Sequence, residues 1–470
     1  MQRPLVPVRS TETFRSLLHP RGIAVVGAST DSEKFAGRIV PSLLACGYTG
    51  GLYPVNPRYQ AIEGLPCYPS VRQVPVPCDL VIVAVPAQYV VGVVEEAAAR
   101  KVGAAIILSA GFDEVGGDGD LRTAELRRVV AETGIRIYGP NCPGLWQIRD
   151  RLVVTFSAQF DPAALLPGPV GLVSQGGALG RAVLDTMDTG LGFSYWFSTG
   201  NEVDLEASDF IDFLAEDSET TVVAAILEGW RDESRLRQAL EHCSTVGKPV
   251  VLLKIGATPG GAMAARNHTA AKGGAVSGES MRSWGCIPVE DLDELSDITR
   301  LFARYPEPGP GGIGVCTFSG GAGGLLADQA AVAGAPLPPL APSTTASLRS
   351  LLPEIAAVAN PTDLTTAVFQ DPDLVGRSLR RMADDPGIGM LLFPLPHRHD
   401  QFDPMIARAL VDLVPRLPKP LVVVALSPTF ASEEANAILR EGKVPVISSA
   451  RRAARAAAAW LAYGSSRSHR

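Results

Sequence analysis

Short apolar runs that end in small or polar residues recur along the whole chain. Residues 23–26, 80–85, 170–173 and 313–318 are four of them, and turns and helix-like segments follow. Such runs have the length of buried strands, and their alternation with helices is typical of parallel, doubly wound sheets. A length of 470 residues corresponds to about three domains. We therefore predict an α/β fold with domains at residues 1–148, 149–304 and 305–470.

The strand ends of the first domain carry residues suited to a bound ligand. Ligands of doubly wound sheets lie at the carboxyl ends of the strands. The turn after residues 23–26 lacks the GxGxxG pattern, so a nicotinamide cofactor is less favoured than another nucleotide-like ligand. Tight packing explains any single turn almost as well. The candidate ligand-binding residues are Gly27, Ser29, Asn56, Pro57, Val85, Pro86, Ser109, Gly111, Asn141 and Cys142.

Two later strands run into glycine-rich helix starts. The free N–H groups of such a start can bind an anion, and the helix dipole favours the anion by about 0.3–1 kcal/mol. One strand–glycine turn–helix unit can be explained by packing, but two of them in successive domains suggest a shared anion. The candidate phosphate-binding residues are Ser174, Gln175, Gly176 and Gly177 in the second domain, and Ser319, Gly320, Gly321 and Gly323 in the third.

A single histidine, His268, lies in the Gly/Ala-rich stretch 254–278 that follows an apolar strand at 250–254. A lone histidine on such a stretch is more often a solvated loop residue than a functional one. Glu228, at the end of the strand 222–227, offers a carboxylate that can accept the Nδ1 proton of an imidazole and leave Nε2 as a nucleophile. A helix cap or a surface charge is the alternative role for Glu228.

The overall composition narrows the function. A net charge of −7 and a pI near 5.5 give no electrostatic reason to expect nucleic acid or an anionic membrane as a partner. The seven cysteines are scattered without CxxC or metal-ligand spacing, so we predict no metal site in this chain. No apolar run approaches 18 residues, and the first residues lack the apolar core of a secretory signal. We expect a cytoplasmic protein with reduced thiols.

Several strings in the chain resemble one known family in both content and order. From about residue 17 to residue 363 the sequence is similar to the α subunit of the ADP-forming acyl-CoA synthetases, relatives of succinyl-CoA synthetase. The order of the strings is more specific than any one of them. The matching strings are GIAVVGAS, YPVNP, SAGFDEVG, GPNCPG, SQGGALG, STGNEVD, the His268 loop, FSGGAGGLLAD and NPTD.

The resemblance implies a role for each domain. An N-terminal Rossmann-like domain would bind coenzyme A through the strand-end residues named above, and two flavodoxin-like ligase domains would follow. His268 would be the phosphate carrier, and Glu228 would orient its imidazole. The two glycine-rich helix starts resemble the paired "power helices" of the family, which would hold one phosphoryl group between them. The chain departs from the family at Lys272, where an apolar residue is usual, and at Gly176, where the family has a serine.

The resemblance also implies a reaction and a partner. The reaction is carboxylate + CoA + NTP ⇌ acyl-CoA + NDP + phosphate, by way of an acyl phosphate and a phosphohistidine. ATP or GTP with Mg²⁺ would bind to a separate ATP-grasp β subunit, so a homo- or hetero-oligomer is expected. Two alternatives stay open: a non-catalytic CoA- or acyl-CoA-binding protein, and an acyl-CoA lyase or transferase that does not use phosphohistidine. The sequence does not identify the acid.

Overall fold

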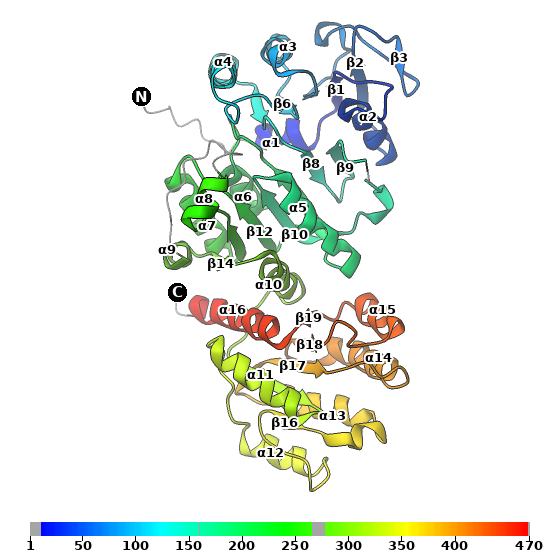
Figure 1. The fold of residues 1–470 in the computed structure, drawn as a ribbon, viewed down its shortest axis with the longest axis vertical. Helices are drawn as coiled ribbons and strands as arrows, with labels where there is room; N and C mark the ends of the chain where they lie inside the picture. The colour runs from blue at the N-terminus through cyan, green and yellow to red at the C-terminus, as the bar shows by residue number, and fades with distance from the viewer. Residues whose placement is uncertain (1–10, 159, 266–277, 469–470) are drawn as a thin grey trace. The chain divides into compact units, whose positions relative to one another are not determined.

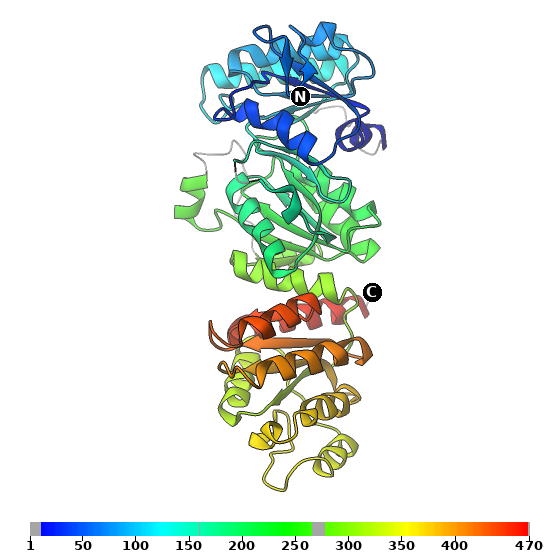
Figure 2. The same cartoon turned by 90° about the vertical axis from the view of Figure 1, so that its right-hand side faces the viewer.

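The computed structural model describes residues 11–158, 160–265 and 278–468. The chain forms two compact units. The first contains residues 1–188 and 192–288, and the second contains residues 189–191 and 289–470. Figure 1 shows the helices and strands of each unit, and Figure 2 shows the same ribbon from a second side. No described helix is long and apolar enough to cross a membrane.

The first sheet of the first unit is parallel and has the strand order β2-β1-β5-β6-β7. Successive residues of its strands point to opposite faces, and both faces are buried. Ile23 and Val25 of β1 belong to one apolar core, while Ala24 and Val26 belong to another. This is why β1, β5 and β6 are apolar at every position rather than at alternate ones. The strands are β1 (Gly22–Val26), β2 (Gly51–Val55), β5 (Leu80–Val83), β6 (Ala104–Ile107) and β7 (Arg136–Tyr138), and the helices are α1 (Thr11–Leu18), α2 (Phe35–Ala45), α3 (Ala87–Ala99) and α4 (Asp118–Thr133). A small antiparallel pair, β3 (Ala61–Ile62) with β4 (Leu65–Pro66), follows β2.

The second sheet has the order β14-β13-β12-β10-β11-β8-β9. Strands β10 to β13 are parallel, whereas β8 and β9 form an antiparallel hairpin that extends the sheet beyond β11. The strands are β8 (Gly144–Gln147), β9 (Leu152–Thr155), β10 (Pro167–Ser174), β11 (Phe193–Ser198), β12 (Val222–Leu227), β13 (Val250–Lys254) and β14 (Ile287–Val289). The helices are α5 (Gly177–Leu184), α6 (Ala207–Glu216), α7 (Glu233–Val246), α8 (Pro259–Ala265) and α9 (Gly278–Ser283).

The third sheet lies in the second unit and is parallel, with the order β16-β15-β17-β18-β19. Its strands are β15 (Gly312–Thr317), β16 (Thr362–Asp363), β17 (Ile388–Leu395), β18 (Leu421–Ala425) and β19 (Val446–Ser448). The helices are α10 (Leu292–Arg304), α11 (Gly320–Val332), α12 (Pro342–Arg349), α13 (Asp373–Ala383), α14 (Asp403–Leu413), α15 (Glu433–Glu441) and α16 (Ala450–Ser468).

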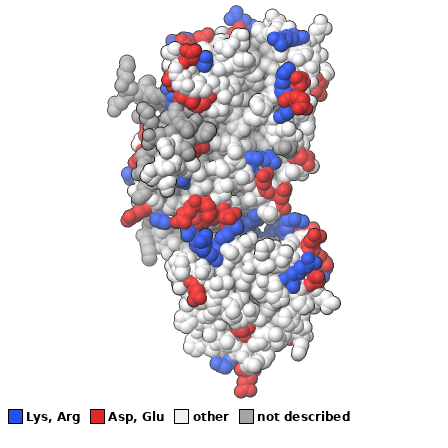
Figure 3. All heavy atoms as spheres, viewed as in Figure 1, with Lys and Arg blue, Asp and Glu red and all other residues white. Residues whose placement is uncertain are grey.

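Helices α10 and α16 are joined by ion pairs, and acidic and basic side chains lie side by side in this region in Figure 3. Nε of Arg452 donates to Oδ2 of Asp297 at 2.7 Å, and Nη2 donates to Oδ1 at 3.0 Å. Arg455 makes a similar bond to Glu294 at 2.8 Å. Arg452 and Arg455 near the chain end therefore take part in the packing of α16 against α10.

The parallel strands of all three sheets follow one order. Numbered within each sheet, they run 2-1-3-4-5 in the first and third sheets and 2-1-3-4 over β10 to β13 of the second, which is the doubly wound arrangement of flavodoxin-like folds. In each sheet the second parallel strand lies on one side of the first, and the third lies on the other side. The three switch points are therefore between β1 and β5, between β10 and β12, and between β15 and β17. Ligands of such sheets bind at these points. The predicted α/β fold is confirmed, while the domain boundaries at residues 148 and 304 stay a prediction.

Candidate functional site

The turn between β10 and α5 lies beside the end of β12. Ser174 ends β10, and Gly176 precedes α5 with an extended backbone (φ −99°, ψ 148°). Gln175 joins the two strand ends, because its Oε1 accepts from the N–H groups of Glu228 and Gly229 at 2.6 and 2.9 Å. Its Nε2 donates to the carbonyl of Gly229 at 2.8 Å. Gln175 is buried, so these three bonds hold the end of β12 against the start of α5.

Glu228 contacts this helix start. A methyl group placed on Gly176 would lie 3.0 Å from Oε1 of Glu228, and no other described atom outside the turn would be within 4 Å. The N–H groups in the first turn of α5 have no partner within the helix, and Gly176 at its N-cap has no side chain to cap them. The structure thus brings together Glu228 and the residues Ser174 to Gly177 that the sequence analysis selected. An anion at α5 would lie close to the Glu228 carboxylate.

Lys254 also reaches this strand end, and the sequence analysis did not include it. Its Nζ donates to the carbonyls of Glu228 and Ile255 at 2.8 and 2.6 Å, and it lies 5.5 Å from the ring centre of Trp230. Burial lowers the pKa of Lys254, and the nearby Glu228 carboxylate opposes that shift. The sequence did contain a sign of such a role for Lys254, since it is a charged residue at the end of an otherwise apolar strand.

His268 lies outside the described residues, as does Lys272. The described chain ends at the last residue of α8, Ala265, and begins again at the first residue of α9, Gly278. A contact between His268 and Glu228 therefore stays a prediction.

The candidate cofactor residues of the first sheet gather at the carboxyl ends of β1, β2, β5 and β6. Gly27 follows β1 with φ of 92°, and a methyl group there would lie 2.4 Å from the carbonyl oxygen of Ala84, so only glycine fits. Nδ2 of Asn56 donates to the carbonyl of Ala28 at 2.8 Å, and the hydroxyl of Ser109 donates to the carbonyl of Val85 at 2.5 Å. These bonds tie neighbouring turns together around the β1/β5 switch point.

The other candidate cofactor residues of the first sheet lie in the same turns or next to them. The Ser29 hydroxyl lies 3.3 Å from the Tyr59 hydroxyl, a residue that the sequence analysis did not include. Pro57 follows Asn56, and Pro86 directly precedes α3. Gly111 has φ of 106°, and its N–H donates to Oε1 of Glu114 at 2.5 Å.

Asn141 and Cys142 connect the first sheet to the second. The N–H of Asn141 donates to the carbonyl of Ser109 at 3.0 Å, and its Nδ2 donates to Oδ1 of Asn201 at 3.3 Å. The thiol of Cys142 is buried and donates to the carbonyl of Ile107 at 3.4 Å. Burial raises the pKa of Cys142 to about 12, so its sulfur is protonated at neutral pH and is no nucleophile.

The loop after β11 is held by charged and polar groups that were not among the candidate site residues, although three of them, Asp113, Asn201 and Glu202, lie in the strings SAGFDEVG and STGNEVD. Nδ2 of Asn201 donates to Oδ1 of Asp113 at 2.7 Å, and Nη2 of Arg231 donates to the carbonyl of Asn201 at 2.7 Å. Glu202 is buried beside them with φ of 57°, and it accepts bonds from the Thr199 hydroxyl and the Ala207 N–H at 2.7 and 3.0 Å. Burial raises the pKa of Glu202 to about 7.

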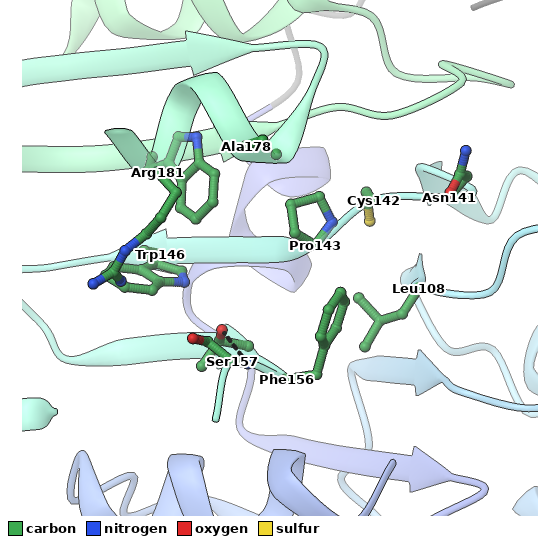
Figure 4. A pocket seen from close by; sticks show the side chains of 12 residues that line it. Leu108, Asn141, Cys142, Pro143, Trp146, Phe156, Ser157, Ala178 and Arg181 are labelled. Carbon is green, nitrogen blue, oxygen red and sulfur yellow. Dashed lines mark hydrogen bonds between the residues drawn. The ribbon is translucent and has the colours of Figure 1, made fainter. Parts of the chain in front are cut away.

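A pocket of about 410 Å³ opens beside the first turn of α5. It is bounded by α5, by the hairpin β8–β9, and by the turns after β6 and β7 (Figure 4). Two candidate cofactor residues, Asn141 and Cys142, and one candidate phosphate-binding residue, Gly177, line it. The pocket therefore joins the site at the first sheet to the site at the second.

The glycine-rich helix start of the third sheet is packed differently. The Ser319 hydroxyl caps α11 by accepting from the N–H of Ala322 at 3.4 Å. A methyl group on Gly320 would lie 3.2 Å from Oδ2 of Asp363, and one on Gly323 would lie 3.1 Å from Cβ of Pro361. The turn that carries Pro361 and Asp363 therefore packs on the first turn of α11, which Gly321 also belongs to. Because α5 and α11 lie in different units, their sharing of one phosphoryl group stays a prediction.

Comparison with known proteins identifies both parts of the first unit. Residues 21–147 match the family model described as a CoA binding domain, and residues 167–302 match the succinyl-CoA ligase like flavodoxin domain. The chain is 33% identical over 378 residues to subunit alpha of the ADP-forming acetate–CoA ligase II of Pyrococcus furiosus, which covers 80% of each chain. The chain belongs to the ADP-forming acetyl-CoA synthetase family. This family is part of the succinyl-CoA ligase superfamily of acid–thiol ligases, so the predicted family is confirmed.

Two further relatives show what share of a related protein's length this chain covers. It is 34% identical over 379 residues to the ADP-forming acetate–CoA ligase I of Archaeoglobus fulgidus, which covers 80% of this chain and 54% of that protein. The structure is similar to the dinucleotide forming acetyl-coenzyme A synthetase 1 of Ca. Korarchaeum cryptofilum in its apo form, with a TM-score of 0.86, 30% identity, and coverage of 97% of this chain and 98% of that chain. The chain thus spans about half the length of the longer acetyl-CoA synthetase and most of the length of the α subunit.

Proposed function

We propose that this chain is the CoA-binding, phosphohistidine-carrying subunit of an NDP-forming acyl-CoA synthetase that works with a separate ATP-grasp subunit. The contact between Glu228 and the start of α5 carries this proposal, because it puts a carboxylate and free helix N–H groups at the switch point of the second sheet. A carboxylate alone repels a phosphoryl group. An imidazole between the two relieves the repulsion, since the carboxylate accepts its Nδ1 proton while Nε2 carries the phosphoryl group.

The residues of the first sheet fit coenzyme A. The turns after β1, β2, β5 and β6 surround the β1/β5 switch point, and Gly27 lets the first turn pack closely against the carbonyl of Ala84. Gly27, Ser29, Asn56 and Ser109 would hold the cofactor there. When bound, coenzyme A supplies the thiol that takes the acyl group. The chain's own residues bind and orient it, and Asn141 and Cys142 join its site to the start of α5.

The family membership supports the reaction and the partner. The P. furiosus relative is named as a subunit alpha, and most of its length matches this chain. The proposed reaction is carboxylate + CoA + NTP ⇌ acyl-CoA + NDP + phosphate, with ATP or GTP and Mg²⁺ bound by the partner subunit. A cytoplasmic location is part of the proposal. Relatives of 27–34% identity are named for acetate, trans-ferulate and 4-hydroxybutyrate, so membership of the family leaves the acid open.

Calorimetry with the purified chain tests the CoA site. CoA is expected to bind at micromolar to sub-millimolar strength, and NAD is expected not to compete. Tight NAD binding without CoA binding would overturn the assignment of the first domain. Acyl-CoA synthesis is expected only when an ATP-grasp subunit is added, so robust ATP- or GTP-dependent synthesis by this chain alone would refute the two-subunit arrangement.

A further inference from the structure

The main chain of Glu228 is held by side chains from two neighbouring strand ends. Its N–H donates to Oε1 of Gln175 at 2.6 Å, and its carbonyl accepts from Nζ of Lys254 at 2.8 Å. Gln175 follows β10 and Lys254 ends β13, so the two side chains reach Glu228 from opposite sides of β12. Both main-chain polar groups of Glu228 are therefore fixed, and with them the point from which its carboxylate extends.

The ammonium of Lys254 is itself fixed in place. Nζ makes a second bond, to the carbonyl of Ile255 at 2.6 Å, and it lies 5.5 Å from the ring centre of Trp230. Trp230 is buried, and its ring centre is 6.4 Å from that of Trp284. Two carbonyl acceptors and an aromatic face thus hold the cation at the end of β12.

The charge of Lys254 also acts on the Glu228 side chain. Burial lowers the pKa of Lys254 and the Glu228 carboxylate opposes this shift, so the two charges interact. The interaction is mutual, and the ammonium therefore favours the ionised form of the carboxylate. Only an ionised carboxylate can accept the Nδ1 proton of an imidazole, and a cation beside it offsets its repulsion of a phosphoryl group.

Lysines at the opposite ends of strands make similar bonds in a different setting. Lys248, two residues before β13, donates to the carbonyls of Leu214 and Asp217 at the end of α6. Lys419, two residues before β18, bonds two carbonyls in the same way. These two lysines lie at the amino ends of their strands. Lys254 lies at a carboxyl end, where doubly wound sheets bind their ligands.

We propose that Lys254 is a positioning residue for phosphoryl transfer, and that its charge and its hydrogen bonds hold Glu228 ready to orient the phosphate-carrying imidazole. The proposal rests on the proposed function, because it assumes that Glu228 orients such an imidazole. In the transfer, the bond from the γ-phosphorus to the leaving NDP oxygen breaks while a bond to Nε2 of the imidazole forms. The Nδ1 proton stays in its hydrogen bond to Glu228, and Lys254 keeps that carboxylate in place.

Chemical replacement of the ammonium in the full chain tests this role. Lys254→Cys removes the ammonium and both of its hydrogen bonds. Treatment with 2-bromoethylamine then attaches an ammonium to the new sulfur at nearly the reach of lysine, whereas 2-bromoethanol attaches a neutral hydroxyl at the same reach. Burial raises the pKa of all seven natural thiols, so these react slowly, and mass spectrometry verifies that one group is attached.

The readout is the acid-labile phosphorylation of the chain by an added ATP-grasp subunit and ATP labelled at the γ-phosphate. We expect the rate at saturating ATP to fall about 10–100-fold in Lys254→Cys, an effect typical of residues that orient another functional group. The aminoethyl group should restore most of this rate, and the hydroxyethyl group little of it. The KM for ATP should be the same in every form, because the nucleotide binds to the partner subunit.

Lys248→Cys, treated with the same two reagents, is the matched control. It removes an ammonium that bonds two carbonyls near the other end of β13, away from Glu228. It should lower the temperature of unfolding and leave the phosphorylation rate at the wild-type value. Thermal unfolding of every form is measured in parallel, so a loss of folded protein is distinguished from a loss of rate.

The outcomes separate this proposal from the proposed function. Phosphorylation of Lys254→Cys at the wild-type rate would overturn the role of Lys254 and leave the proposed function standing. Equal restoration by the two reagents would also overturn it, because a neutral donor would then suffice. A wild-type chain that stays unlabelled while acyl-CoA is formed would overturn the proposed function, and the role of Lys254 with it.

Discussion

Replacement of Gly180 by alanine is expected to destabilise the first unit, although alanine is the better helix former. Gly180 lies inside α5, where the change from glycine to alanine favours the helix by about 1 kcal/mol. The added methyl group, however, would lie 2.5 Å from Oγ of Ser174 and 2.6 Å from Nε1 of Trp196. Both side chains are buried, and they are joined by a hydrogen bond of 2.9 Å. The methyl group therefore cannot fit unless this bond breaks or the helix moves.

The magnitude follows from three contributions. Overpacking of a buried site costs about 1–3 kcal/mol. Separation of the Ser174 and Trp196 side chains leaves buried polar groups without partners, which costs about 1–3 kcal/mol more. After the gain in helix propensity is subtracted, Gly180→Ala should lower the free energy of unfolding by about 1–5 kcal/mol. Gly92→Ala in α3 meets no such contact, so it should raise that free energy by up to about 1 kcal/mol.

Urea unfolding followed by tryptophan fluorescence measures both variants. Because the chain has two compact units, the transition of the first unit must be analysed separately from that of the second. A Gly180→Ala protein that is as stable as Gly92→Ala, or more stable than the wild type, would show that Ser174 and Trp196 do not pack beneath α5 as described.

Three further predictions concern other parts of the chain. Gly176→Ala keeps an extended backbone and meets only Oε1 of Glu228, so its free energy of unfolding should change by less than about 1 kcal/mol while the rate of phosphoryl transfer falls; an unchanged rate would refute the role of this contact. Burial raises the pKa of Glu202 from 4.5 to about 7, so the wild type loses stability as the pH rises from 4.5 to 7. In urea titrations over this pH range, the free energy of unfolding of Glu202→Gln should increase relative to that of the wild type by up to about 3 kcal/mol. A difference that does not change with pH would contradict the raised pKa. Arg452→Met removes the cation that is hydrogen-bonded to the buried Asp297 carboxylate and should destabilise the second unit by about 3–5 kcal/mol in thermal unfolding. A neutral effect would show that the ion pair is dispensable.

The sequence allowed the strands and their terminal turns to be predicted because each depends on a few neighbouring residues. A run such as 170–173 is buried on both faces, and Gly177 after it is required by close packing, because a methyl group there would lie 2.8 Å from Cγ of Pro143. The alternation of strands and helices predicts parallel sheets, but it does not specify the order of the strands within them. Candidate site residues at the strand ends could be selected by their chemical type, as Glu228 and Gln175 were.

The remaining parts of the site depend on pairs of residues that are distant in sequence. Gln175 is bonded to Glu228 and Gly229 more than 50 residues later, and Asn201 is bonded to Asp113 88 residues earlier. Nothing in the local sequence of either partner specifies the other. The pocket beside α5 is a further case, since Trp146 of β8 and Trp196 of β11 meet there through strand pairing across 50 residues of sequence.

Phosphorylation of the chain is the most direct test of the proposed function. The chain is incubated with an ATP-grasp subunit and ATP labelled at the γ-phosphate, and the label bound to protein is then followed in acid and in base. We predict a label that is lost in acid and persists in base, that is absent in His268→Ala and His268→Asn, and that forms about 10²–10⁴-fold more slowly in Glu228→Gln. A wild-type chain that stays unlabelled while acyl-CoA is formed, or a label that survives in His268→Ala, would contradict a phosphohistidine at this position.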